Sequence, residues 1–353
     1  MNKRIVALAV AFSASAHTHA IENLKDFNPA VSVILDGVYY HDSEDGEGIE
    51  LIEEHDSVLH SHGGHEHEEH AHGVENGLNL RETEITFSGA VDPHFDAWFT
   101  AAVSDGEIEI EEAWIRTQGL PSGLQLKAGK FLSAIGYENE KHVHGWQFTD
   151  QNLALASMFG DHGLADTGLQ LTWLAPTSSF LQLGVEVLQG SELERFGMTV
   201  EDADELAEEI AEEFDLANNP GIIYDPNGDD ALDGEELGLE DHGGPALSVG
   251  FVRFGPDLGT DQALQLGLAI GRHDYMQTVH EEEGGEIFVA EGSANLYSLH
   301  AVYKRFATGA YGQGGLSLQA EYLTFDSDQE ATYHTDEAEL GLPLELNQDA
   351  AYV

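Results

Sequence analysis

The chain contains no cysteine and few basic residues, and each shortage excludes a class of protein. Without cysteine there are no disulfides and no thiolate metal ligands, and a chain of 353 residues is long enough to fold without them. Only 13 Lys plus Arg stand against 66 Asp plus Glu, which gives a formal net charge of −53 at pH 7. Such a field repels nucleic acid and concentrates cations, so we expect no nucleic-acid partner.

Long apolar runs are also missing. No stretch approaches the eighteen or so consecutive apolar residues of a transmembrane helix. The apolar stretch from Ile5 to Phe12 is shorter, follows Lys3-Arg4, and precedes small residues that end at Ala16 and Ala20. This order is typical of a secretory signal peptide, predicted over residues 1–20; a buried N-terminal helix is the alternative. The mature chain, 21–353, is therefore expected to be exported.

The sequence also lacks recognisable catalytic groups. Nothing in the sequence resembles a nucleophile with its base, a glycine loop that cradles phosphate, or a buried carboxylate pair. We therefore expect that the protein is not an enzyme.

What the sequence does contain is alternation of apolar and polar residues, the signature of β-strands with two unlike faces. Twelve alternating segments are expected, at residues 31–40, 78–91, 95–103, 107–118, 124–129, 168–173, 181–187, 247–251, 264–270, 295–306, 316–325 and 347–353. In a soluble sandwich the apolar face would point inward, whereas in an outer-membrane barrel it faces lipid.

The lengths of the connections favour the barrel. Short connections at 92–93, 119–123, 175–178, 255–261 and 307–312 alternate with long ones at 41–77, 132–163, 191–244, 274–293 and 327–345, and only the short connection 104–106 breaks the rule. Outer-membrane barrels have short periplasmic turns and long extracellular loops. The sequence therefore predicts an all-β fold, a transmembrane antiparallel β-barrel. Because the chain stops at Tyr352-Val353 without a strand that ends in an aromatic residue, we expect it to be truncated before closure.

A run of histidines stands in the first long connection, the His-rich loop 41–77. Six of thirteen residues are histidine, interleaved with three glutamates: His60, His62, His65, His67, His70 and His72. Imidazole nitrogens beside carboxylate oxygens suit Zn²⁺ and, less selectively, Cu²⁺ or Ni²⁺. The run predicts metal capture outside the cell; an incidental solvated loop is the alternative.

Further histidines flank the connection 132–163. His142 and His144 are two residues apart on a segment that would be extended, so they point the same way, and His162 lies at its other end. They are candidate ligands that pass zinc inward, or else scattered polar loop residues.

The acidic loop 191–244 carries a spacing close to that of a calcium-binding loop. The matching oxygen donors are Asp225, Asn227, Asp229, Asp233 and Glu236. Asp230 replaces the usual glycine of such loops. A structural Ca²⁺ and a solvated acidic loop remain the two interpretations.

Three cations stand out in this acidic chain: Arg116, Lys127 and Lys130. They precede the connection 132–163, where they could line a pore and set its selectivity. Alternatively they pair with Glu109 or Glu111 across neighbouring strands.

Residues 124–140, with Gly129-Lys130-Phe131 and Gly136-Tyr137, resemble the phosphate-selective porin O/P type of barrel, in which such a strand leads into a constriction loop. The stretch 131–190 is similar to proteobacterial outer-membrane proteins described as zinc-regulated, often labelled TonB-dependent receptors. It includes His142-Val-His144-Gly-Trp146 and Gly160-Asp161-His162-Gly163. The resemblance implies the bacterial cell outer membrane and a link to zinc supply.

Together these observations predict a porin-like protein that captures zinc at its His-rich loop and admits it. A surface metal-binding or adhesion scaffold without transport and a TonB-energised zinc receptor are the alternatives. Expected partners are outer-membrane lipid, the barrel assembly machinery and, as in many porins, two further copies in a homotrimer. Zn²⁺ is the expected ligand or substrate and Ca²⁺ a structural ion.

Overall fold

The computed structural model describes residues 29–41, 77–104, 107–147, 151–160, 163–190, 242–281, 287–307, 314–335 and 338–352. Its strands are β1 (Ala30–Tyr40), β2 (Gly77–Asp92), β3 (Phe95–Ser104), β4 (Glu107–Thr117), β5 (Leu124–Leu132), β6 (Ala165–Leu174), β7 (Phe180–Leu188), β8 (Leu247–Gly255), β9 (Gln262–Glu281), β10 (Ile287–Arg305), β11 (Leu316–Thr335) and β12 (Ala338–Tyr352). The described helical segments are η1 (Pro121–Gly123), η2 (Val143–Gly145) and α2 (Leu153–Phe159). The prediction of twelve strands and an all-β fold is confirmed.

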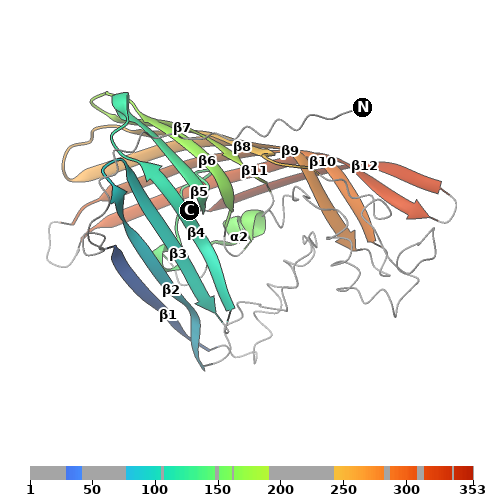
Figure 1. Ribbon diagram of the computed structural model, residues 1–353, viewed down its shortest axis with the longest axis horizontal. Helices are drawn as coiled ribbons and strands as arrows, with labels where there is room; N and C mark the ends of the chain where they lie inside the picture. Colours follow the sequence, from blue (N-terminus) through green and yellow to red (C-terminus); the bar gives the residue numbers. More distant parts are fainter. Residues whose placement is uncertain are drawn as a thin grey trace.

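The strands form one antiparallel sheet in the order of the sequence, β1 to β12. Figure 1 shows this sheet curved like the wall of a barrel, with α2 on its concave side. Within the described residues, β1 and β12 each pair on one side only. No helix in the same ranges has the length and apolar character needed to cross a membrane.

The two faces of the sheet have the opposite character from those of a soluble protein, as β7 shows most clearly. Glu186 is 1% exposed, whereas its neighbours Val185 and Val187 are 52% and 43% exposed. Since successive side chains point to opposite faces of a strand, the carboxylate lies on the concave face and the valines lie on the convex face. A soluble sheet would bury the valines.

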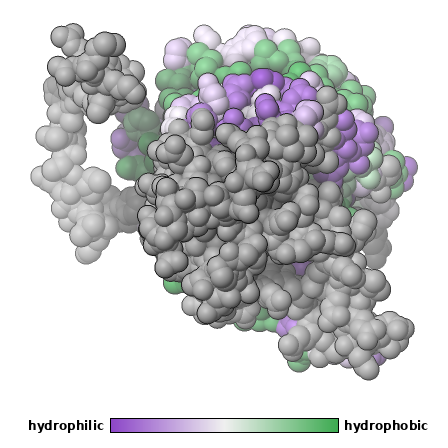
Figure 2. All heavy atoms as spheres, turned by 90° about the vertical axis from the view of Figure 1, so that its right-hand side faces the viewer, coloured by the Kyte–Doolittle hydropathy of each residue, from purple (hydrophilic) through white to green (hydrophobic). Residues whose placement is uncertain are grey.

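The same inversion recurs around the wall. Buried polar side chains of the concave face include Glu82, Glu84 and Thr86 of β2, Asp166, Gln170 and Thr172 of β6, Ser298 and His300 of β10, and Glu321 of β11. Exposed apolar side chains of the convex face include Val31, Val33 and Leu35 of β1, Leu169 and Leu171 of β6, Leu266, Leu268 and Ile270 of β9, and Leu299 of β10. Figure 2 shows hydrophobic residues over the upper part of the visible surface, with hydrophilic residues beside them.

The connection between β5 and β6 fills part of the concave side, and we call its residues 133–164 the inner segment. Ser133 donates its hydroxyl to Glu186 Oε2 at 2.5 Å, and Ala134 donates its N–H to Glu186 Oε1 at 3.0 Å. Further along, the N–H of Tyr137 donates to Glu321 Oε1 at 3.0 Å. Buried carboxylates of β7 and β11 thus hold the backbone of the inner segment across the interior.

Apolar packing reinforces these hydrogen bonds. Ile135, Leu155, Met158 and Phe159 of the inner segment form a buried cluster with residues of the wall: Leu188, Leu247, Val249, Phe251, Ala269, Met276, Ala294, Leu296, Leu323 and Phe325. A side chain at Gly136 would collide with the Glu321 carboxylate, so the absence of a Cβ permits this close approach. In the porins that residues 124–140 resemble, such a strand leads into a constriction loop, and the inward contacts of Ser133, Ala134 and Tyr137 agree with that course.

This cluster corrects the expectation that the apolar face always points outward. In β8, Val249 and Phe251 are buried against the inner segment rather than exposed, because that segment offers the concave face an apolar partner. Two glycines of the wall are closely covered by neighbouring side chains. A Cβ at Gly184 would collide with the Phe251 ring, and one at Gly267 with the His300 imidazole.

Two predicted long connections are strands instead. Residues 274–293 belong largely to β9 and β10, and residues 327–345 largely to β11 and β12. These stretches are rich in polar residues and lack apolar alternation, so their sequence predicts loops. Backbone pairing between antiparallel strands needs no apolar face, and cross-strand pairing continues there.

Candidate metal centre

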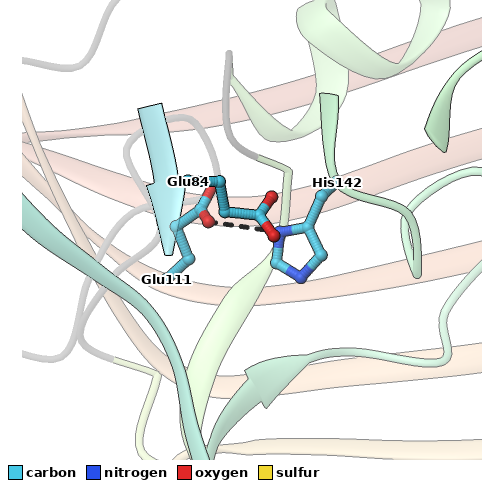
Figure 3. A group of neighbouring side chains, drawn as sticks. All are labelled: Glu84, Glu111 and His142. Carbon is cyan, nitrogen blue, oxygen red and sulfur yellow. Dashed lines mark ion pairs between the residues drawn. The ribbon is translucent and has the colours of Figure 1, made fainter. Parts of the chain in front are cut away.

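Three elements bring together a cluster of carboxylates and imidazoles on the concave side. Glu84 comes from β2, Glu111 from β4 and His142 from the inner segment. One possible ligand atom of each lies within 4.8 Å of the other two. Figure 3 shows the carboxylates of Glu84 and Glu111 directed toward the imidazole ring of His142.

A β-bulge in β4 makes this convergence possible. Thr100 of β3 pairs with Glu112 while Ala101 pairs with Ile110, so Glu111 is an extra residue without a partner in the register. In a regular strand Glu111 and Glu112 would point to opposite faces; the bulge lets both reach the concave side. It also moves Trp114, expected on the apolar face with Ile110, to the concave side, where it packs against the core.

The distances describe a connected group of ionisable side chains. His142 Nδ1 lies 3.4 Å from Glu111 Oε2, and His142 Nε2 lies 3.0 Å from Glu112 Oε2. The neighbouring His144 places its Nδ1 2.8 Å from Glu84 Oε2. The rings of His142 and His144 are parallel, with centroids 6.0 Å apart.

Two of the carboxylate oxygens are incompletely satisfied. Glu84 and Glu111 are only 3% and 8% exposed, yet neither Glu84 Oε2 nor Glu111 Oε2 receives a well-aligned hydrogen bond, despite the nearby imidazoles. By contrast, Glu112 Oε1 accepts hydrogen bonds from Trp114 Nε1 and the N–H of Leu132. Buried charged oxygens without such donors are costly, and a cation removes that cost.

The electrostatics of the cluster are dominated by its carboxylates. Burial by itself would lower the pKa of His142, but the two facing carboxylates, Glu111 at 3.4 Å and Glu112 at 3.0 Å, outweigh it and raise this pKa to about 10. The ring is therefore held in place by negative charge from both sides. The same charge attracts a divalent cation, which would compete with the ring proton.

The donor set fits a zinc-like ion. Zinc bonds to nitrogen and oxygen are about 2.0–2.2 Å long, so ligand atoms of one ion lie at most about 4.4 Å apart. The spacing within 4.8 Å therefore needs only small side-chain rotations to close. One imidazole and two carboxylates suit a borderline divalent transition metal, and His144 is near enough to add a second nitrogen.

The residues predicted from sequence have different outcomes. The rings of His142 and His144 lie side by side, and their predicted role in passing zinc inward stays a prediction. His162, His60, His62, His65, His67, His70 and His72 lie outside the described residues, and so do Asp225, Asn227, Asp229, Asp233 and Glu236 of the acidic loop. Those predictions stay untested.

The three predicted pore-lining cations divide between the faces. Lys127 pairs in register with Arg116 and with the buried Gln170, which places these residues on the concave face. There Arg116 lies 3.2 Å from Asp96, and the Lys127 ammonium lies 4.1 Å from the Phe131 ring centroid. Lys130 is three residues further along β5, so alternation assigns it to the opposite, convex face, and the pore-lining role of the three cations stays a prediction.

Sequence reasoning missed Glu84 and Glu111 as ligands. Glu84 was read only as the polar half of an alternating strand, and Glu111 only as an ion-pair partner for a lysine. The consecutive carboxylates Glu111-Glu112 inside an alternating strand were the available signal, because two like residues in a row interrupt period-2 alternation.

Comparison with known proteins gives a partial context. No family model matches the chain. It is 33% identical over 330 residues to an uncharacterized protein of Aquifex aeolicus; the match covers 93% of this chain and 61% of the length of that relative. Among solved structures it is similar to a high-pH structure of Pseudomonas putida OprB, with a TM-score of 0.34 and 10% identity over 82% of this chain and 90% of that chain.

Proposed function

We propose that this chain forms a porin-type barrel in the bacterial outer membrane that admits divalent metal ions, zinc first among them. The observation that carries the proposal is the inverted sheet, with carboxylates buried on its concave face and aliphatic side chains exposed on its convex face. Water cannot stabilise so large an apolar surface, whereas lipid can.

The charge of the concave side supports a preference for cations. Glu84, Glu111, Glu186 and Glu321 are all buried there, and several of them bind backbone or imidazole groups of the inner segment. Rings of acidic side chains are the usual basis of cation selectivity in pores. The His-rich loop, with its six histidines, would raise the local metal concentration at one entrance.

The first experiment measures conductance. Refolded full-length protein is added to a planar bilayer under a salt gradient, and we expect discrete current steps with a reversal potential that favours cations. A zinc-sensitive dye inside proteoliposomes should report Zn²⁺ entry above that of empty vesicles. Protein that stays soluble without detergent and gives no current would overturn the proposal.

A second experiment tests the role of the histidine run. A strain whose protein lacks residues 61–71 should grow more slowly than the parent under zinc chelation and recover when zinc is added. Its protein should keep the conductance of the parent, which separates metal capture from the pore. Equal growth of both strains would exclude zinc capture by this run.

A second candidate function is a surface metal-binding scaffold without transport. The observation in its favour is the apolar packing of Ile135, Met158 and Phe159 of the inner segment against the wall, which occupies part of the concave side. In that case the protein would insert into bilayers and bind metal but carry little current. The conductance measurement above separates the two functions.

A further inference from the structure

We propose that Glu84, Glu111 and His142 bind one divalent transition-metal ion inside the barrel, and that this ion fastens the inner segment to the wall. The inference depends on the proposed function only for zinc as the physiological metal; the site itself would exist in a barrel that carries no current.

The first argument is the origin of the ligands. Glu84 stands on β2, Glu111 on β4 and His142 on the inner segment, so an ion bound by all three joins two wall strands to the segment that crosses the interior. At its other contacts this segment is already fastened by carboxylates, Glu186 of β7 and Glu321 of β11, which accept backbone N–H groups. On the β2–β4 side the described contacts of the inner segment include the imidazoles of His142 and His144 on glutamates.

The second argument is the incomplete hydrogen bonding of two buried carboxylate oxygens. Glu84 Oε2 and Glu111 Oε2 are buried and directed into the cluster, where His144 Nδ1 lies 2.8 Å from the first and His142 Nδ1 3.4 Å from the second, but neither oxygen receives a well-aligned hydrogen bond. A cation between them neutralises the repulsion of two buried like charges and completes the bonding of both oxygens. Glu112 does not require a cation, because Oε1 accepts hydrogen bonds from Trp114 Nε1 and the N–H of Leu132. Its other oxygen, Oε2, lies 3.0 Å from His142 Nε2.

Glu112 thereby acts as a positioning residue. A carboxylate on the second nitrogen of a ligating histidine fixes its ring orientation and increases its basicity. His142 Nε2 lies 3.0 Å from Glu112, which leaves Nδ1 toward Glu111 and the metal. Glu112 and His142 thus have the relative positions of the supporting carboxylate and the ligand in a carboxylate–histidine–metal arrangement.

The test uses full-length refolded protein in which the six histidines of the run 60–72 are replaced by asparagine, so that they do not compete for metal. Zn²⁺ affinity is measured by competition with a chromophoric chelator, and Co²⁺ reports the ligand geometry by its visible absorption. The variants E84Q, E111Q and H142N remove one proposed ligand each. The controls E330Q and H94N make the same chemical changes at exposed positions on β11 and in the β2–β3 turn.

We expect one equivalent of metal in the parent and in both controls, and a loss of affinity of about tenfold or more in each ligand variant. E112Q should lose less, because it removes a positioning group rather than a ligand. E111D should retain more affinity than E111Q, even if both variants fold less well. Binding in the three ligand variants equal to that of the controls would overturn the site.

The same preparations are examined in the planar bilayer. Conducting protein whose ligand variants bind metal like the controls overturns only the metal site. Protein that binds one ion through these residues but carries no current overturns only the channel. An E112Q variant that loses as much affinity as E111Q would show that the cluster is an ion-pair network without a defined metal site.

Discussion

The convex and concave faces of the same strands differ in composition as strongly as the surface and interior of a soluble protein, but in the opposite sense. On β7 the exposed side chains are Val185 and Val187 and the buried one is Glu186. The alternation has the same period in both kinds of protein, so period alone does not say which face meets water. What the comparison teaches is that burial decides which face meets water, and burial of the polar set is the basis of our proposal that lipid surrounds the convex face.

The largest expected effect comes from placing a charge on the convex face. Leu268, 44% exposed in the middle of β9, faces lipid in our interpretation, so L268R should destabilise the folded protein by about 2–4 kcal/mol in bilayers. The free energy of unfolding is measured by urea titration in lipid vesicles.

The matched control for this change is L258R. Leu258 is 41% exposed but lies in the turn between β8 and β9, where the same substitution should cost about 0–1 kcal/mol. If L268R and L258R destabilise the protein equally, the middle of the convex face is not surrounded by a more apolar medium than the turn.

A smaller effect is expected on the concave face. Glu186 accepts hydrogen bonds from the Ser133 hydroxyl, the Ala134 N–H and Gln170 Nε2, so E186L leaves these donors buried and unsatisfied. We expect destabilisation of about 1–3 kcal/mol and a more loosely held inner segment, seen as faster proteolysis within residues 133–164. V185A, on the opposite face of the strand, should leave that proteolysis unchanged.

A third prediction compares two lysines on one strand. Lys127 faces the interior and Lys130 the exterior, by alternation along β5. K127Q should shift the reversal potential under a salt gradient toward stronger cation selectivity, because it removes positive charge from the pathway. K130Q should leave the reversal potential where it is; equal shifts would contradict the assignment of faces.

The smallest effect concerns protonation of His142 in chelator-treated protein. Burial lowers the pKa of this imidazole, but Glu111 and Glu112 of β4, which face the ring, outweigh that effect and raise the pKa from 6.5 to about 10. The Glu84–His144 pair lies beside the ring. A raised pKa stabilises the fold fully below pH 6.5, and this contribution is lost as the pH rises through about 10.

The measurement is NMR of labelled imidazole. The His142 ring should remain protonated at pH 8, and H142N should remove the fall in stability between pH 7 and 10. A ring that titrates near the ordinary value of 6.5 would show that the carboxylates do not hold it as described.

Much of the wall could be predicted from the sequence. Alternation such as Leu266-Gly267-Leu268-Ala269-Ile270 is a local property, and β9 follows it with the leucines outward. The prediction failed where the local pattern was weak, as in the polar stretches that extend β9 to β12. It also failed in β8, where Val249 and Phe251 are buried against the inner segment instead of being exposed on the convex face.

The candidate metal centre was predicted in part. The sequence singled out His142 and His144 on the assumption that their segment is extended, which is wrong: the 3-10 turn η2 (Val143–Gly145) brings the two rings side by side. Their partners were not singled out, because Glu84 and Glu111 approach them only through the pairing of β2, β3 and β4 and the return of the inner segment.

The sequence by itself determined most of the strand-forming segments and their two unlike faces, because each depends on residues close together in the chain, and it determined the acidic charge through composition alone. Only the tertiary structure decided which face is buried, and only it placed the bulge at Glu111 and the meeting of Glu84, Glu111 and His142. These depend on strand register and on packing between distant residues, which local periodicity does not encode.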